Sequence, residues 1–252
     1  MDQTFETRPA ECEKHGQFEQ REIRILGRHI TWTQCPKCVA EEDERAAAHA
    51  KREEAERRQA MAEARLHSAG VPTRFITKTL ASYVADTPDK TKVRDAMGRF
   101  SATFADQLAR GTSVVLSGNP GTGKSHLAIG VLQEVMARGW TGMYLSGMDM
   151  VRMVRDTWRR DSSRSETEVL DILAGLDLLV LDEVGVQYGT DGEQVILFSV
   201  LDRRYRDARP TILLTNQASD DFSGFVGPRI ADRLRESGAW LRLDWESHRG
   251  RK

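Results

Sequence analysis

Short apolar runs alternate with longer mixed stretches from about residue 90 onward. Five of these runs are predicted to be strands: residues 113–118, 141–146, 176–182, 209–216 and 239–245. Runs such as LLVL are apolar at consecutive positions, which is typical of strands covered by helices on both faces. Five helices are predicted around them: residues 124–138, 149–160, 165–174, 191–207 and 227–236. Ser165 and Glu168 fit a capping box at the start of the third helix. The alternation predicts an α/β fold with a parallel sheet and right-handed crossovers.

A charged stretch precedes this region. Residues 41–67 are nearly all Ala, Glu, Arg and Lys, which are strong helix formers, and pairs such as Glu54 with Arg58 place the acid first at i,i+4 spacing. The only large apolar residues there are Met61 and Leu66, so the helix has no broad face to bury. Two interpretations stay open, a solvated spacer and a partner-binding helix. The segment Gly70-Val71-Pro72 is predicted to end it.

These patterns divide the 252 residues into a short N-terminal module (1–40), a charged helix or linker (41–70) and an α/β domain (71–252). The net charge is only −1, so any nucleic-acid site has to be a local basic patch. No apolar run reaches the roughly 18 residues of a membrane helix, and the acidic, polar N-terminus does not predict a signal peptide. Three cysteines in such a chain do not suggest disulfides, and we expect a cytoplasmic protein without a membrane partner.

A phosphate-binding loop follows the first predicted strand of the α/β domain. Its residues match the pattern G-x-x-x-x-G-K-[ST] at every fixed position: Gly118, Asn119, Pro120, Gly121, Thr122, Gly123, Lys124 and Ser125. The glycines let the backbone N–H groups approach the phosphates of ATP closely, and the following helix presents its positive end to them. Lys124 is expected to reach the β- and γ-phosphates, and Ser125 to ligate Mg²⁺.

Two carboxylates end the predicted strand at 176–182, about 58 residues after the loop. Ligands bind at the carboxyl ends of the strands in open α/β sheets, so Asp182 is expected to hold Mg²⁺ through water and Glu183 to act as general base on the attacking water. Asn216 ends the next strand and is predicted to orient that water, the alternative being an ordinary turn asparagine. The sequence therefore predicts Mg²⁺-dependent ATP hydrolysis.

A cysteine–histidine cluster lies in the N-terminal module. Cys12 with His15 and Cys35 with Cys38 form two pairs at i,i+3 spacing, and all three cysteines of the chain fall in this window. Zn²⁺ prefers four tetrahedral S and N ligands, so the four residues predict a structural zinc site, with a small hairpin between the pairs. His29 is an alternative to His15, and two unrelated exposed pairs remain the alternative to a metal site.

A basic helix is predicted between the second strand and the acidic pair. Arg152, Arg155 and Arg159 have i, i+3, i+7 spacing and would share one helical face, while Val154 and Trp158 would pack on the domain. A row of arginines suits the phosphates of single-stranded DNA. An ordinary solvated face, with pairing to acids such as Asp161, is the equally weighted alternative.

With these residues in place, residues 110–249 resemble AAA+ ATPases of the DnaC/IstB branch. The resemblance rests on the segments SGNPGTGKSHLA, LDLLVLDEVGVQ, EQVILFSVLDRRYRDARPTILLTN, RIADRL and LDWES. It implies that the loop at 118–125 is the Walker A motif, that Asp182 and Glu183 form Walker B, and that Asn216 is sensor 1.

The same resemblance implies roles for three arginines near the nucleotide. Arg233 falls at the arginine-finger position, Arg229 lies one turn earlier, and Arg249 falls at the sensor-2 position. On the helical face that Arg229 and Arg233 share, only Glu236 offers a nearby carboxylate in sequence, and a structural ion pair is the alternative to a finger.

The family resemblance also implies a function. Loaders of this branch bind the replicative hexameric DNA helicase and open or hold its ring so that single-stranded DNA can enter during replication initiation. The N-terminal region would then grip the helicase, and the ATPase domains would self-assemble into an AAA+ oligomer on it.

Two other functions remain open. The first is a transposition helper ATPase of the same branch, which does not obviously need the cysteine–histidine module and the charged helix. The second is a nucleotide-gated adaptor without significant turnover, against which Glu183 argues, because a sensor that does not hydrolyse ATP has no need of a general base.

Overall fold

The computed structural model describes residues 6–25, 28–185 and 190–248. The chain forms two compact units, Met1–Met61 and Ala62–Lys252. No helix within the described ranges is both long enough and apolar enough to cross a membrane.

The first unit contains a three-stranded antiparallel sheet. Its strands are β1 (Thr7–Cys12), β2 (Gly16–Ile25) and β3 (Arg28–Trp32), in that spatial order. The hairpin expected between the two cysteine-containing pairs is therefore present, with β1 added at its edge. Among the described residues up to Met61, only Glu22 and Cys35 are buried. The sheet thus has almost no apolar core to stabilise it.

Helix α1 (Pro36–Ser68) begins five residues earlier than predicted. Proline is well suited to a first helical position because its missing N–H has no partner there, so Cys35-Pro36 starts the helix and brings Cys38 into its first turn. The residues from Glu42 to Ala62 are all exposed. Leu66 is the one buried residue that the helix carries, and Gly70 follows its end, as predicted. The predicted lack of a broad buried face is confirmed.

The second unit is built on a five-stranded parallel sheet. Its spatial order is β5-β6-β7-β4-β8, and each paired strand runs parallel to its neighbour. The bounds are β4 (Ser113–Gly118), β5 (Gly142–Ser146), β6 (Leu178–Asp182), β7 (Thr211–Thr215) and β8 (Gly238–Leu243). All five predicted strands are present, so the predicted α/β class is confirmed.

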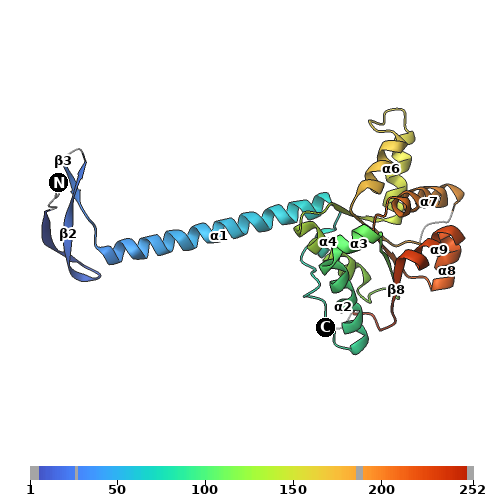
Figure 1. Cartoon of the computed structure of the whole chain (residues 1–252), viewed down its shortest axis with the longest axis horizontal. Helices are drawn as coiled ribbons and strands as arrows, with labels where there is room; N and C mark the ends of the chain where they lie inside the picture. Colours follow the sequence, from blue (N-terminus) through green and yellow to red (C-terminus); the bar gives the residue numbers. More distant parts are fainter. Residues whose placement is uncertain (1–5, 26–27, 186–189, 249–252) are drawn as a thin grey trace. The chain divides into compact units, whose positions relative to one another are not determined.

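Helices cover both faces of this sheet, and side chains along each strand alternate between two apolar clusters. Val114 and Leu116 pack with one set of helices, whereas Val115 packs with the other. The first set is α2 (Pro88–Ala102), α3 (Phe104–Arg110) and α4 (Lys124–Ala137). The second set is α5 (Gly147–Arg155), α6 (Glu166–Gly175), α7 (Asp191–Arg206), α8 (Ser219–Val226) and α9 (Pro228–Ser237). Figure 1 shows these helices around the sheet, of which β8 is labelled. The capping box of Ser165 and Glu168 is confirmed.

The predicted helix at 149–160 was wrong at its end. Helix α5 stops at Arg155, a short 3₁₀ turn covers Asp156–Trp158, and Arg159 has extended backbone. Trp158 does not pack on the domain: it is 58% exposed, and its Nε1 donates to a carboxylate oxygen of Glu166 at 2.6 Å. Met150, Val151 and Val154 already supply the apolar face that packs on the domain. No residue of the following 3₁₀ turn is buried.

Candidate nucleotide and metal sites

The phosphate-binding loop joins β4 to α4, where the sequence places it. Gly123 has φ +99°, and a Cβ added there would lie 2.6 Å from the ring of Tyr83, so only glycine fits. The ammonium of Lys124 donates to the carbonyl oxygens of Gly118 at 2.6 Å and Asn119 at 2.9 Å. These two hydrogen bonds hold the Lys124 side chain within the phosphate-binding loop.

The acidic pair follows β6, which is separated from β4 by β7 in the sheet. The hydroxyl of Ser125 donates to Oδ2 of Asp182 at 2.6 Å, and the hydroxyl of Tyr144 donates to the same oxygen. The backbone N–H of Glu183 donates to Oδ1 of Asp182 at 2.7 Å. Tyr144 could not be predicted from the sequence, because its place beside Asp182 depends on the register of β5 and β6.

Glu183 has the unusual backbone conformation of a positive φ, +57°. Such conformations cost free energy for residues other than glycine and cluster at functional sites. Glu183 is exposed, whereas Asp182 one residue earlier is buried. The turn thus separates the two carboxylates, which both line the same cavity: Asp182 is buried at the end of β6, and Glu183 is exposed.

One cavity of about 850 Å³ collects these groups. The predicted residues that line it are Pro120, Gly121, Gly123, Lys124, Ser125, Asp182, Glu183 and Asn216. A loop with an ammonium group on one side, and a hydroxyl and carboxylates on the other, suits a polyphosphate with Mg²⁺, which prefers oxygen ligands. The donor set therefore fits ATP and Mg²⁺, with Ser125 and Asp182 on the metal side.

Two further side chains hold the loop from behind. The carbonyl oxygen of Thr122 accepts hydrogen bonds from the hydroxyl of Tyr83 at 3.1 Å and from Nε1 of Trp245 at 2.9 Å. Burial, with the nearby Asp86 carboxylate, raises the pKa of Tyr83 to about 12, so the phenol stays protonated and keeps donating. Trp245 lies in the LDWES segment, but no role followed from the sequence for either side chain.

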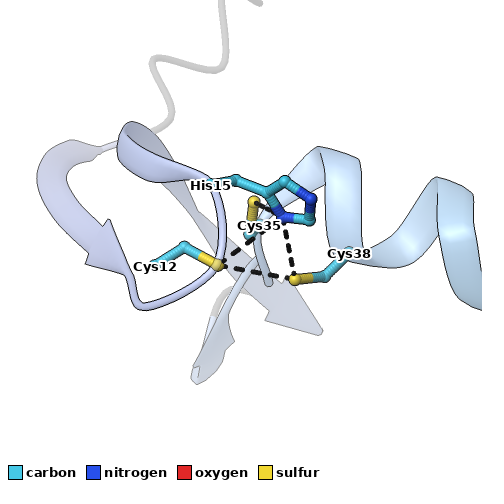
Figure 2. Close-up of side chains that lie close together, drawn as sticks. All are labelled: Cys12, His15, Cys35 and Cys38. Carbon is cyan, nitrogen blue, oxygen red and sulfur yellow. Dashed lines mark hydrogen bonds between the residues drawn. The ribbon is translucent and has the colours of Figure 1, made fainter.

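The four predicted metal ligands come together at the start of α1 and at the turn after β1. Their ligand atoms all lie within 4.8 Å of one another. Cys38 Sγ is 3.3 Å from Nδ1 of His15 and 3.5 Å from Cys12 Sγ, and Cys35 Sγ is 3.8 Å from the same nitrogen. Figure 2 shows the four side chains pointing toward one common centre. Tetrahedral zinc with bonds of about 2.0–2.3 Å requires ligand separations of about 3.3–3.8 Å, so the cluster fits the ion.

The surroundings of the cluster also suit a metal. His15 presents Nδ1 to the sulfur atoms, and its Nε2 lies 3.1 Å from Oε1 of Glu41, which also pairs with Lys14. A carboxylate on the second nitrogen fixes the ring of a metal-binding histidine. Backbone N–H groups of Lys14 and His15 lower the pKa of Cys12 to about 6, which favours the thiolate that binds metals.

His29 is not part of the cluster. Its Nδ1 lies 2.8 Å from a carboxylate oxygen of Glu22, which is buried and also accepts from Arg24 at 2.6 Å. The alternative in which His29 replaces His15 therefore disagrees with the structure.

The three nucleotide-linked arginines have different surroundings. Arg233 on α9 forms an ion pair with Asp202 of α7, and its guanidinium lies 4.5 Å from the ring centre of Tyr205. Arg229 is exposed at the start of α9. Arg249 lies outside the described residues. Within one chain Arg233 thus has the structural ion pair foreseen as the alternative to a finger, although with Asp202 in place of Glu236.

The three arginines predicted to contact DNA do not form one helical face. Arg152 and Arg155 lie on α5, but Arg159 lies beyond its end. Each has an acidic neighbour: Arg152 lies 3.4 Å from Asp149, Arg155 lies 3.7 Å from Glu193, and Arg159 lies 3.3 Å from Asp161. Arg152 and Arg159 remain largely exposed.

Comparison with known proteins gives several relatives. The replicative helicase loader DnaC of Escherichia coli is 39% identical over 140 residues, which are 55% of this chain and 57% of that protein. The DnaC of Buchnera aphidicola subsp. Acyrthosiphon pisum is 29% identical over 185 residues, 73% of this chain and 74% of that protein. The chain therefore spans little more than half the length of the Escherichia coli relative.

Solved structures share the fold of the second unit. A crystal structure of the DnaC helicase loader aligns with a TM-score of 0.62 at 20% identity, covering 68% of this chain and 99% of that one. A DnaA replication initiator bound to AMPPCP and single-stranded DNA aligns with a TM-score of 0.58 at 20% identity, covering 67% of this chain and 50% of that one. At these identities the likeness shows the AAA+ fold alone.

A family model extends over most of the sequence. The model described as IstB-like ATP binding protein matches residues 41–251. The chain therefore belongs to the IstB-like ATP-binding family, as a AAA+ protein homologous to the DnaC helicase loaders.

Proposed function

We propose that this protein is an ATP-hydrolysing loader that places a replicative hexameric DNA helicase on single-stranded DNA. One observation carries the proposal: a cavity with the groups needed for ATP hydrolysis lies in a chain whose relatives are replicative helicase loaders. Fold likeness alone does not establish function, so the residues of the cavity carry the enzymatic part.

Each residue of the cavity has a separate role in hydrolysis. Lys124 and the N–H groups of the loop bind the phosphates, and Ser125 with Asp182 hold the magnesium ion, which offsets phosphate charge when bound. Glu183 takes a proton from the attacking water, and its exposed position after β6 supports this role. Asn216 follows β7 and lines the same cavity, where its amide can orient that water.

The first unit is proposed to be a zinc-stabilised module that binds the helicase. The ligand separations around His15 support zinc, and the scarcity of buried residues leaves metal as the main source of stability. Four protein ligands leave no open coordination position, which supports a structural role. The exposed residues from Glu42 to Ala62 extend the polar surface that a partner protein can contact.

Self-assembly and DNA binding complete the proposal. Arg233, with Arg229 one turn earlier, is proposed to act on the nucleotide of a neighbouring copy in an AAA+ oligomer, and Arg249 on the nucleotide of its own chain. Arg152, Arg155 and Arg159 are proposed to contact single-stranded DNA, which is supported only by their exposed guanidinium groups. Neutralising all three should weaken DNA binding and reduce its salt dependence.

The test uses the full chain, the purified hexameric helicase of the same host and a circular single-stranded DNA. Loading is measured as helicase that stays on the circle after a high-salt wash. We expect ATP-dependent loading, and a Lys124→Ala variant should load little helicase while retaining its zinc module. If the chain neither binds the helicase nor raises loading above the level without it, the loader proposal is refuted.

Two alternatives give different results in the same assays. An IstB-like transposition helper would bind duplex DNA and a transposase, and would ignore the helicase. An adaptor without turnover would bind the helicase in the presence of ATP but release no phosphate. The unusual φ of Glu183 and its place in the cavity favour hydrolysis over the adaptor.

A further inference from the structure

The carboxylate of Asp182 has a partner that belongs to neither nucleotide-binding motif. Tyr144 lies on β5 opposite Val180 of β6, so its side chain is on the same face as that of Asp182, two residues further along. The Tyr144 hydroxyl accordingly donates to Oδ2 of Asp182, the oxygen that also accepts from Ser125.

The hydrogen bonds of Asp182 determine the orientation of its carboxylate. A carboxylate has about four acceptor positions, two on each oxygen. Both positions of Oδ2 are taken, by Ser125 and Tyr144, and one position of Oδ1 is taken by the N–H of Glu183. The remaining acceptor position is on Oδ1, so the orientation of the carboxylate is determined before any ion binds.

Tyr144 is itself held firmly. It is only 9% exposed, and burial together with the Asp182 carboxylate raises its pKa, so it remains a donor. Strand β5 is at the edge of the sheet, and the N–H of Tyr144 donates to the carbonyl oxygen of Ala69 at 2.7 Å. Gly70, with φ +81°, lies against the Tyr144 carbonyl group, where a Cβ would collide. The segment after α1 therefore fixes the position of this tyrosine on the strand.

We propose that Tyr144 is a positioning residue of the magnesium site. Its hydroxyl keeps the Asp182 carboxylate turned so that one acceptor position on Oδ1 is left for the hydration shell of the ion. The inference rests on the proposed nucleotide chemistry of this cavity. It predicts that removal of the hydroxyl weakens metal binding without weakening nucleotide binding in the absence of metal.

The test measures metal affinity directly on the full chain. Mn²⁺ is titrated into protein saturated with ADP and followed by electron paramagnetic resonance, for the wild type and for Tyr144→Phe. Loss of a partner that orients a metal ligand costs about 10- to 100-fold in metal affinity, and a fall of that size is expected. Affinity for a fluorescent ATP analogue in EDTA should be unchanged, because the ring stays in place.

Tyr205→Phe is the matched control, since it removes a tyrosine hydroxyl that donates to Glu236 and does not line the cavity. We expect its Mn²⁺ affinity to equal that of the wild type. Unchanged Mn²⁺ affinity in Tyr144→Phe, or an equal fall in both variants, would overturn the inference. Because metal binding is read without turnover, a wild-type chain that binds Mn²⁺ with ADP but hydrolyses no ATP would reject the proposed ATPase activity alone.

Discussion

Replacing His15 or His29 should distinguish the loss of a zinc ligand from the loss of an imidazole elsewhere in the first unit. In His15→Ala the cluster loses the nitrogen that lies 3.3 Å from Cys38 Sγ, together with the contact to Glu41. In His29→Ala the contacts to the buried Glu22 and to the ring of Trp32 are lost. Both changes remove an imidazole from the same unit, so they differ chiefly in whether a metal ligand is removed.

The expected magnitude follows from the ligand count. Structural zinc sites bind with about 10–16 kcal/mol, so one ligand of four accounts for about 3–4 kcal/mol, or about 10²–10³-fold in affinity. Only Glu22 and Cys35 are buried among the described residues up to Met61, so no apolar core compensates for the loss of the ion. Strands β1 to β3 should therefore lose protection from amide hydrogen exchange in His15→Ala.

Zinc content is measured by mass spectrometry on freshly purified protein that has met no chelator, and exchange is followed on residues 7–32. We expect about one Zn²⁺ per chain in the wild type and in His29→Ala, and far less in His15→Ala. Nucleotide binding should be the same in all three. A wild-type protein without zinc, or a His15→Ala variant that keeps it, would refute the assignment of the cluster.

Three other predictions concern the second unit. Glu183→Gln should bind ATP normally but release phosphate about 10²–10⁴-fold more slowly in steady-state assays, the usual contribution of a general base. If Arg233 acts across an interface, Arg233→Ala should abolish the rise of ATPase activity with protein concentration. Mixing this variant with Glu183→Gln should restore part of the activity. No recovery in mixtures shown to co-assemble would contradict this role. Arg204→Met should lower the free energy of unfolding in denaturant titrations by about 3 kcal/mol. Arg204 is buried and donates to the carbonyl oxygens of Leu173, Ala174 and Leu176, and each costs about 1 kcal/mol or more when it loses this partner. An unfolding free energy within 1 kcal/mol of the wild type would contradict the role of Arg204.

The three inner strands β4, β6 and β7 could be predicted because they are buried on both faces and carry their signal locally. The runs around Val115 and Val180 are apolar whichever way each side chain points, so no knowledge of the neighbouring strand is needed. The loop at 118–125 and the acids after β6 are local in the same sense. Parallel strands bring their carboxyl ends to one edge, which is why Asn216 also reaches the cavity.

What the sequence missed depends on contacts between distant segments. Tyr144 reaches Asp182 only because β5 and β6 pair in one particular register. Tyr83 and Trp245 meet at one carbonyl group although 162 residues separate them. The end of α5 was missed for a different reason, since Arg159 continues a helical spacing while the buried face has already ended at Val154.

The ion pair of Arg233 shows how a structural contact and a role across an interface can coexist. Its side chain is 27% exposed, so part of it stays accessible while the guanidinium pairs with Asp202. The ring of Tyr205 adds a flat surface that accepts the guanidinium whichever anion lies beside it. A phosphate group is an anion with the same preference for paired N–H donors as a carboxylate. In the proposed oligomer, exchange of Asp202 for the phosphate of a neighbouring copy would therefore replace one charge-assisted contact by another and leave the guanidinium with a partner.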